Sequence, residues 1–220
     1  QDTIDIIECL LAGQSQDLQV TMKYDGSPAI FWGHDSCGDP FVATKSIFNK
    51  KPKINRSFTE IWNNHGMHSG LSFKIIECLV ALPQVKNSTI YQGDLLFINN
   101  LLIDDASSFQ PNIIRYTPID DKLITKIANA PLGIAVHTKY INGNRSPITQ
   151  DDLSDLARAN NCGAFVLDCL IDHQQFTHQV QRIQHTIKAL QSNLIVHRQQ
   201  ANIDIELLKV LGEAIVQFTN

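Results

Sequence analysis

Residues 21–33 read TMKYDGSPAIFWG, in which a lysine, an aspartate and a glycine stand directly before an apolar and aromatic run. The apolar run is typical of a β-strand, and Asp25-Gly26 is a dipeptide that favours a tight turn. We therefore predict a β-hairpin with its turn at these two residues, where Gly26 permits the reversal of the chain. The hairpin does not explain Lys23, since a lysine beside a turn is most often exposed and without a role.

Several strand-like segments and one helical region follow this stretch. The strand-like segments are FVATKSIF (41–48), STIYQGDLLFIN (88–99) and PLGIAVHTKYI (131–141). Between the first two lies a mixed helical region that includes SGLSFKIIECLVAL (69–82). This order of elements predicts an α+β fold with an antiparallel sheet.

Both ends of the chain are predicted to be helical. DTIDIIECLLA (2–12) has apolar residues at helical spacing before Gly13, and two apolar stripes follow residue 174. Thr149 is a predicted N-cap, and GAFVLDCLI (163–171) is an apolar run of ambiguous type. We divide the chain into a core domain, 1–143, and a mainly helical insertion or tail, 144–220, and a truncated protein is an open alternative.

Composition limits the classes of function. A hydrophobic content of 43% can fill a normal core, and a net charge of −4 excludes nucleic-acid binding through bulk positive charge. The five cysteines have no C-x-x-C spacing, and neither a signal peptide nor a membrane-spanning apolar run is visible. We therefore expect a cytoplasmic protein that does not enter a membrane. No sequence feature sets the oligomeric state.

Lys23, Asp25 and Gly26 form a Lys-x-Asp-Gly motif. It resembles the first motif of the covalent nucleotidyltransferases, which include ATP-dependent DNA and RNA ligases and mRNA-capping enzymes. In that superfamily the lysine attacks the α-phosphate of a nucleotide and forms a lysyl-nucleotide intermediate. A free lysine amine is protonated at neutral pH, so such a site must lower its pKa by nearby positive charge or by desolvation.

Four further segments strengthen the resemblance, because they follow the motif in an order similar to that of the ligase motifs. They are TKSIF (44–48), YQGDLLF (91–97), FQPNIIRYTP (109–118) and LGIAVHTKY (132–140). The combination resembles uncharacterised ligase-like proteins of tailed bacteriophages and covers about residues 18–141. It implies a ligase-type adenylyltransferase fold with antiparallel sheets, and the cytoplasm of a bacterial host as the location.

The resemblance also implies roles for particular residues. It implies ATP and Mg²⁺ as cofactors, and a nucleic acid with a 5′-phosphate end, DNA or RNA, as the partner in end joining or repair. Lys23 would be the nucleophile, and Asp94 would hold ribose or the metal. The residues expected at the nucleotide are Asp25, Gly26, Lys45, Asp94 and His137, and those expected at phosphates are Lys50, Lys51, Lys53 and Arg56.

The sequence departs from the family pattern in three ways. Pro28 replaces an arginine that usually contacts the nucleotide sugar, and Asp94 replaces a glutamate that is one methylene longer. The acid-Gly and Lys-x-Lys strands that normally close the motif series are not found in the 220 residues. These departures favour an alternative, a catalytically impaired nucleotide-binding or structural phage protein with the ligase fold. A capping-type guanylyltransferase is a third reading.

Two other groups of residues have simpler interpretations beside the functional ones. The basic loop NKKPKINR (49–56), with Arg115 as a weaker candidate of the same kind, is either a phosphate-binding element or a solvated loop. Thiolates and imidazoles are the ligands that zinc prefers, but the spacing matches no common zinc site, and buried structural cysteines are favoured. The residues concerned are Cys162, Cys169, His173 and His178.

Overall fold

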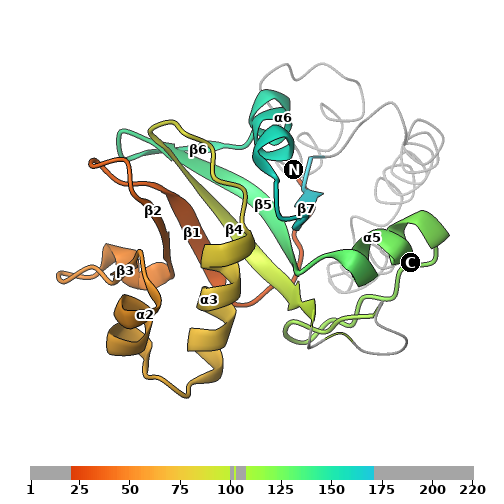
Figure 1. Ribbon diagram of the computed structural model, residues 1–220. Helices are drawn as coiled ribbons and strands as arrows, with labels where there is room; N and C mark the ends of the chain where they lie inside the picture. The colour runs from red at the N-terminus through yellow and green to blue at the C-terminus, as the bar shows by residue number, and fades with distance from the viewer. Residues whose placement is uncertain (1–20, 100–101, 103–107, 171–220) are drawn as a thin grey trace, which may run out of the picture. The chain divides into compact units, whose positions relative to one another are not determined.

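A seven-stranded sheet forms the centre of the computed structural model, which describes residues 21–99, 102 and 108–170 of the chain (Figure 1). The strands are β1 (Ala29–His34), β2 (Pro40–Ala43), β3 (Ile54–Asn55), β4 (Thr89–Ile98), β5 (Leu132–Ile141), β6 (Asn144–Pro147) and β7 (Phe165–Asp168). The order across the sheet is β3-β2-β1-β4-β5-β6, and β7 also pairs with β5. All of the described residues fall within one compact unit, Val20–Ile171.

The sheet is antiparallel apart from its last strand. β4 pairs with β1 on one side and with β5 on the other, and both pairings are antiparallel. β6 is antiparallel to the second half of β5, whereas β7 is parallel to the first half of the same strand. The predicted α+β class with an antiparallel sheet is therefore confirmed.

The helices begin where short polar side chains cap them. They are α2 (Phe58–His65), α3 (Gly70–Ala81), α5 (Asp121–Asn129) and α6 (Gln150–Ala159), with the short 3₁₀ helix η1 (Lys45–Phe48). The Ser69 side chain accepts a hydrogen bond from the backbone of α3, and Thr149 and Asp152 form a capping box at α6. None of the helices in the described ranges is long and apolar enough to cross a membrane.

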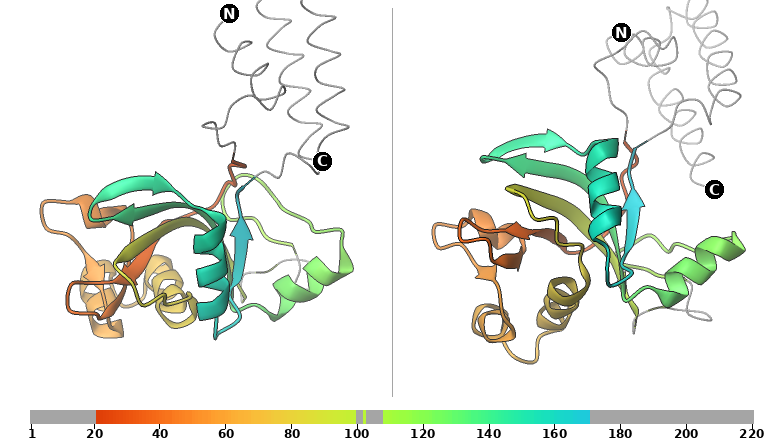
Figure 2. Two further views of the ribbon diagram at one scale, coloured as in Figure 1. Left: turned by 90° about the horizontal axis from the view of Figure 1, so that it is seen from above. Right: turned by 45° about the horizontal axis from the view of Figure 1, so that its top comes forward.

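One face of the sheet, which we call the helix face, carries the main core. α2 and α3 lie together on one side of the strands, and α6 lies beside β7 (Figures 1 and 2). Apolar residues from α3 recur at helical spacing and pack against alternate residues of β1 and β4. The main buried members are Ile30, Trp32, Ile75, Cys78, Tyr91, Leu95, Ile134 and Leu156.

The other face of the sheet, which we call the opposite face, has two smaller apolar clusters. One contains Phe97 and Phe109 with residues of α5, and the other contains Phe31, Phe41 and Ala43. Along β4, Gln92 and Asp94 lie between the residues that join these two clusters, Ile90 and Leu96. The centre of the opposite face is therefore polar.

Three predictions about local structure need correction. Asp25 and Gly26 do not form a hairpin turn, because β1 pairs with β2 and β4, and Thr21 bridges to Leu170 instead. The 41–48 segment is a strand only to Ala43, because the Thr44 side chain caps η1. The sheet unit also extends past the expected boundary at residue 143, since β6, α6 and β7 belong to it.

The remaining segments gave mixed outcomes. The predicted strands at 88–99 and 131–141 and the predicted helices at 69–82 and after Thr149 are confirmed as β4, β5, α3 and α6. The ambiguous run at 163–171 contains β7. The predicted helix at 2–12 and the apolar stripes after residue 174 lie outside the described residues.

Candidate functional site

The segment that contains Lys23 leads into β1 and is attached to the last strand of the unit. The backbone N–H of Met22 donates a 2.7 Å hydrogen bond to the carbonyl oxygen of Cys169. Tyr24 packs into the apolar cluster around Phe97, and burial raises the pKa of Tyr24 to about 12, so the ring stays neutral. Lys23 itself is exposed, and no residue in the described part of the chain forms a hydrogen bond or ion pair with it.

Gly26 brings this segment into direct contact with β4. A Cβ atom built at Gly26 would lie 2.6 Å from the Cβ of Asp94 and 2.9 Å from its carbonyl carbon, which is closer than side chains tolerate. Gly26 is not among the glycines with a positive φ angle. The glycine is thus required by the close approach of the two backbones, and not by the sharp turn that the sequence predicts. The Lys-x-Asp-Gly segment and the YQGDLLF segment (91–97), which both carry part of the resemblance, are therefore in contact in the fold.

Asp25 holds a second loop against the same segment. Its carboxylate accepts hydrogen bonds from Asn112 Nδ2 (3.0 Å) and from the backbone N–H groups of Ile113 (2.8 Å) and Ile114 (3.1 Å). Its own N–H donates to the hydroxyl oxygen of Tyr116 at 2.7 Å. We call these four contacts the Asp25 latch. The hydrogen bond from Asn112, followed by those from the two backbone groups, lowers the pKa of Asp25.

Asp94 and His137 form the polar centre of the opposite face. The pairing of β4 with β5 shifts between Gln92 and Gly93, which leaves His137 without a residue directly opposite. At this bulge the His137 Nε2 lies 3.7 Å from the Asp94 Oδ2, and His137 Nδ1 lies 2.8 Å from the Thr138 hydroxyl. About a quarter of each of the two ionisable side chains is exposed. The pair is thus accessible to a ligand.

An aromatic cluster continues the opposite face beyond this pair. The Tyr140 hydroxyl donates a 2.9 Å hydrogen bond to Gln92 Oε1, and Tyr140 lies against Phe31 and Phe48. Phe48 is the last residue of η1, which begins with Lys45. Lys45 is exposed, and it lies on the same short helix as Phe48 of the aromatic cluster.

The basic loop divides into residues that the fold uses and residues that it leaves exposed. The Lys53 Nζ donates a 2.6 Å hydrogen bond to the Asn64 carbonyl oxygen near the end of α2. Arg56 forms a 2.7 Å ion pair with Asp35 and a second one with Glu60. Lys50 and Lys51 are exposed and have no hydrogen bond or ion pair with the described residues. Of the four basic residues in this loop, only Lys50 and Lys51 can therefore bind a phosphate without losing a contact with the described residues.

Sequence reasoning assigned no role to Asn112, Tyr116, Gln92 or Phe48. Asn112 and Tyr116 lie in the FQPNIIRYTP segment, which carried part of the resemblance, but nothing in the sequence relates them to Asp25. Gln92 was visible only as a polar residue in the strand-like run that contains Asp94. A period-two reading of that run would place both on one face of the sheet.

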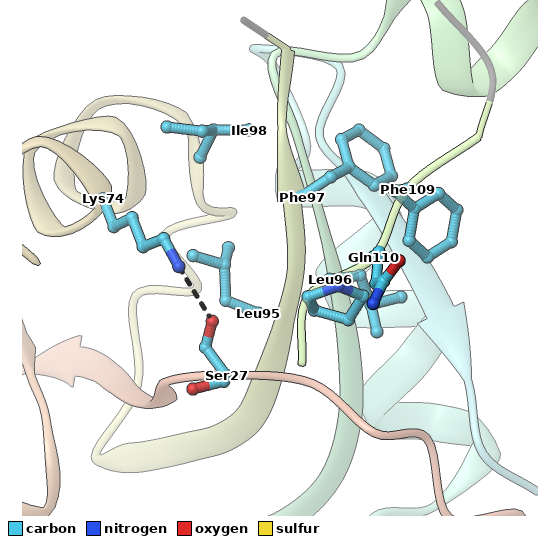
Figure 3. Close-up of a pocket in the computed structure, with 9 residues that line it drawn as sticks. Ser27, Lys74, Leu95, Leu96, Phe97, Ile98, Phe109 and Gln110 are labelled. Atoms are coloured by element: carbon cyan, nitrogen blue, oxygen red, sulfur yellow. Dashed lines mark hydrogen bonds between the residues drawn. The ribbon is translucent and has the colours of Figure 1, made fainter. Parts of the chain in front are cut away.

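A small hollow lies beside Ser27 and the second half of β4 (Figure 3). The Lys74 Nζ donates to the Ser27 carbonyl oxygen at 3.3 Å, and Leu95, Phe97 and Gln110 line the hollow. Its volume is about 50 Å³. Cavities that hold a ligand of nucleotide size are usually several times larger, about 300 Å³ or more. The hollow is therefore not the candidate site.

The Asp94 carboxylate fits a metal ion that is bound together with the phosphates of a substrate. Among the described residues, His, Cys, Asp and Glu side chains form no group of three that could hold a metal by themselves. Asp94 nevertheless offers carboxylate oxygens, and Mg²⁺ commonly binds through one or two carboxylates together with substrate phosphates. The candidate site thus has a carboxylate with a neighbouring imidazole and an aromatic cluster, and the exposed Lys23 lies three residues before the glycine that contacts Asp94.

Comparison with known proteins gives one match. No curated protein and no solved structure matches the chain. The match is to a protein family described as a family of unknown function (DUF6267), and it extends over residues 2–218. Because it covers nearly the whole sequence, the chain belongs to this family.

Proposed function

We propose that the protein is a covalent nucleotidyltransferase of the polynucleotide-ligase type, with Lys23 as its nucleophile. The observation that supports this most strongly is the contact of Gly26 with Asp94, which joins the Lys-x-Asp-Gly segment to the polar centre of the opposite face. His137 lies beside Asp94 in that centre. The proposal accounts for a lysine, a carboxylate and an imidazole that come from three separate segments.

In the proposed reaction the Lys23 Nζ attacks the α-phosphorus of ATP. An N–P bond forms while the bond between the α-phosphorus and the bridging oxygen breaks, so pyrophosphate leaves and AMP remains on the lysine. The ammonium group must lose a proton to solvent before the attack, since only the free amine has the electron pair. The AMP would then pass to the 5′-phosphate end of a nucleic acid, which prepares that end for joining.

The other residues would bind and orient the nucleotide. Asp94 would accept hydrogen bonds from ribose hydroxyls or hold Mg²⁺, which would neutralise phosphate charge when bound. His137 would lie near the base, and Lys45 would contact a phosphate of the nucleotide or of the nucleic-acid end. Asp25 has a different task from the expected one, because its carboxylate already accepts three hydrogen bonds from the 112–114 loop. We propose that it positions this loop beside Lys23.

Intact-mass spectrometry tests the proposal directly. The purified full chain is incubated with Mg²⁺ and either ATP or GTP, and is then treated with pyrophosphate. We expect an added nucleotide whose mass identifies the base and which pyrophosphate removes. Lys23→Ala and Lys23→Arg should both lack the adduct, because a guanidinium stays protonated and cannot replace the amine. Lys122→Ala, a change at an exposed lysine of α5, should retain it. An adduct on Lys23→Ala would disprove the assignment.

A second candidate is a nucleotide-binding or structural protein without catalysis. The observation that favours it is the use of Asp25, Lys53 and Arg56 by contacts within the chain, which leaves fewer groups for a nucleotide. Pro28, in place of the arginine of the family pattern, points the same way. Equilibrium dialysis with labelled ATP separates the two candidates. Binding that saturates without any covalent adduct would favour this second function.

A further inference from the structure

Phe48 is an exposed aromatic residue that is nevertheless held in place. Its side chain is 65% exposed, far more than the other rings of its cluster. Its ring centroid lies 5.2 Å from that of Phe31 in an edge-on arrangement and 6.1 Å from that of Tyr140. Contacts of this kind fix the ring while most of its surface stays in water. A fixed and exposed ring is suited to stacking against a flat group.

Three lysines accompany Phe48 in a short stretch of sequence. Lys45 begins η1, and Lys50 and Lys51 follow it, and all three are exposed without a described hydrogen bond or ion pair. The two other basic residues of the loop, Lys53 and Arg56, are bound to the fold. We call Lys45, Phe48, Lys50 and Lys51 the 45–51 patch. In a chain of net charge −4, this is a local concentration of free positive charge.

We propose that the 45–51 patch binds single-stranded nucleic acid, with one base stacked on Phe48 and the neighbouring phosphates on the three lysines. Proteins that bind single strands combine stacking aromatic residues with a positive track for the backbone, and the patch has both. An unpaired strand is required, since a base within a duplex has no free face to offer. The inference names the substrate strand of the proposed reaction and in that respect rests on the proposed function.

The spread of the lysines favours a polynucleotide over a mononucleotide. One nucleotide needs its phosphates near the nucleophile, Lys23, whereas the patch has three separate exposed cations within three residues of Phe48 in the sequence. A strand with one phosphate per nucleotide matches such a series of single charges. An acidic peptide would match the charges but not the exposed ring. A polyglutamate competitor therefore distinguishes the two kinds of partner.

Fluorescence anisotropy with labelled oligo(dT) and oligo(U) tests the ring. The full-length chain without ATP is the binding protein. We expect Phe48→Ala to weaken binding by about tenfold, the usual size of a lost stacking contact, and Phe48→Trp to retain it. Phe58→Ala is the matched control, because Phe58 is another exposed aromatic residue, on α2, and its loss should leave binding unchanged. Circular dichroism confirms that each variant is folded.

The salt dependence of binding tests the lysines. Each phosphate contact to a single strand contributes about 0.7 to the slope of log K against log salt concentration. Lys50→Ala with Lys51→Ala should therefore reduce the slope by about 1.4. Lys122→Ala with Lys126→Ala is the control of equal charge, on α5, and should leave the slope unchanged. Equal losses in both double variants would mean that overall charge, not the patch, attracts the strand.

Adduct formation on Lys23 separates this inference from the proposed function. If wild type binds no oligonucleotide, or if polyglutamate displaces it as readily as unlabelled oligonucleotide does, the inference is overturned. It is also overturned if Phe48→Ala lowers nucleotide adduct formation but not oligonucleotide binding, because the base on Phe48 would then be that of ATP. If Lys23 forms no adduct while the patch variants lose oligonucleotide binding, the proposed function fails and the strand-binding patch stands.

Discussion

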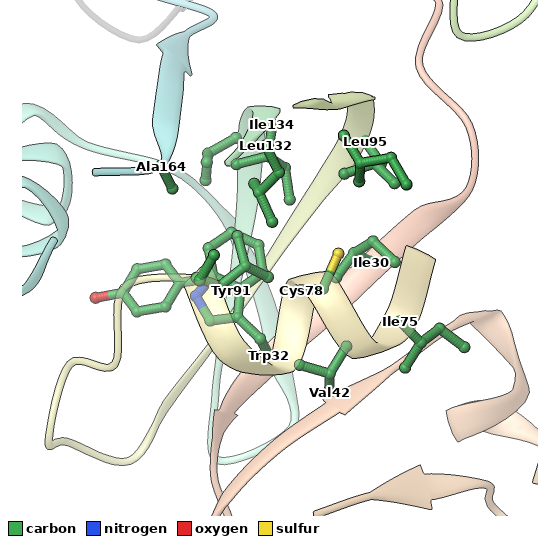
Figure 4. Packing of buried hydrophobic residues seen from close by; sticks show 14 of the residues in the cluster. Ile30, Trp32, Val42, Ile75, Cys78, Tyr91, Leu95, Leu132, Ile134 and Ala164 are labelled. Carbon is green, nitrogen blue, oxygen red and sulfur yellow. The ribbon is translucent and has the colours of Figure 1, made fainter. Parts of the chain in front are cut away.

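The two faces of the sheet bury different kinds of surface. On the helix face, Trp32, Tyr91 and Leu95 pack with Ile75 and Cys78 of α3 in one continuous apolar cluster (Figure 4). On the opposite face, apolar residues form two separate clusters with a polar stretch of β4 between them. The helix face contains the largest apolar cluster of the described residues, whereas the opposite face has partly exposed polar side chains at its centre.

A single strand supplies both faces through its alternation. Tyr91 and Leu95 of β4 are buried on the helix face, and Gln92 and Asp94 are partly exposed on the opposite face. Gly93 between them allows β5 to approach, since a Cβ there would lie 2.6 Å from the Ala135 carbonyl oxygen. The buried core and the polar centre of the opposite face can therefore be changed separately, by substituting neighbouring residues of one strand.

The first prediction breaks the helix face without touching the other. Leu95 is 1% exposed and belongs to the main cluster, so Leu95→Ala leaves a cavity in the core. We expect a loss of about 2–5 kcal/mol in the free energy of unfolding. Urea denaturation followed by circular dichroism measures it. A loss below about 1 kcal/mol would show that the core collapses around the cavity and that the helix face is less important than its burial indicates.

The second prediction concerns the contact between the Lys23 segment and β4. In Gly26→Ala the added methyl group meets the backbone of Asp94, which cannot move as a flexible side chain can. We expect a loss of about 1–3 kcal/mol in stability, together with reduced nucleotide adduct formation, because the segment must shift. Gly70→Ala is the control, since nothing lies within 4 Å of a Cβ at that position. Equal stability of both variants would contradict the close contact.

The sequence predicts most of the sheet because its pattern is local. The alternation and apolar runs of 88–99 and 131–141 identify β4 and β5, and the capping residues at Thr149 identify the start of α6. Such patterns depend only on neighbours within a few residues. The same reasoning missed α5, β6 and the end of β2 at Ala43, where a single capping side chain, that of Thr44, changes the structure.

The candidate site could be predicted only in part, because its contacts are long-range. Lys23, Asp94 and His137 were proposed from motifs, and the structure brings Asp94 next to His137 and to Gly26. The Asp25 latch joins residues 87 or more positions apart, and no local pattern encodes such a contact. The Lys-x-Asp-Gly motif therefore predicts that Asp25 binds a ligand, whereas its carboxylate accepts hydrogen bonds from its own chain.

The third prediction changes the opposite face without touching the core. Asp94→Asn keeps the shape of the side chain but removes the charge that would hold ribose or Mg²⁺. We expect nucleotide adduct formation to fall at least about tenfold, with the stability changed by less than about 0.5 kcal/mol. Asp94→Glu, which restores the length of the family's usual acid, should label at least as well as the wild type. Unchanged labelling in Asp94→Asn would mean that this carboxylate has only a structural role.

The fourth and smallest effect is a pH dependence of stability that comes from the Asp25 latch. Hydrogen bonds lower the pKa of Asp25 in the folded protein, so the ionised carboxylate stabilises the fold at pH values above its unfolded pKa of about 3.9. This contribution is lost as the pH falls through the lower folded pKa. In urea denaturation across pH 2–8, the difference in stability between wild type and Asp25→Asn should stay constant above about pH 5 and shrink below about pH 4. Asp39→Asn, at an exposed aspartate whose side chain accepts no described hydrogen bond, is the control and should show a smaller pH-dependent difference. A difference for Asp25→Asn that persists unchanged at the lowest pH would mean that the latch does not depend on the charge of the carboxylate, and that its neutral hydrogen bonds alone hold the 112–114 loop.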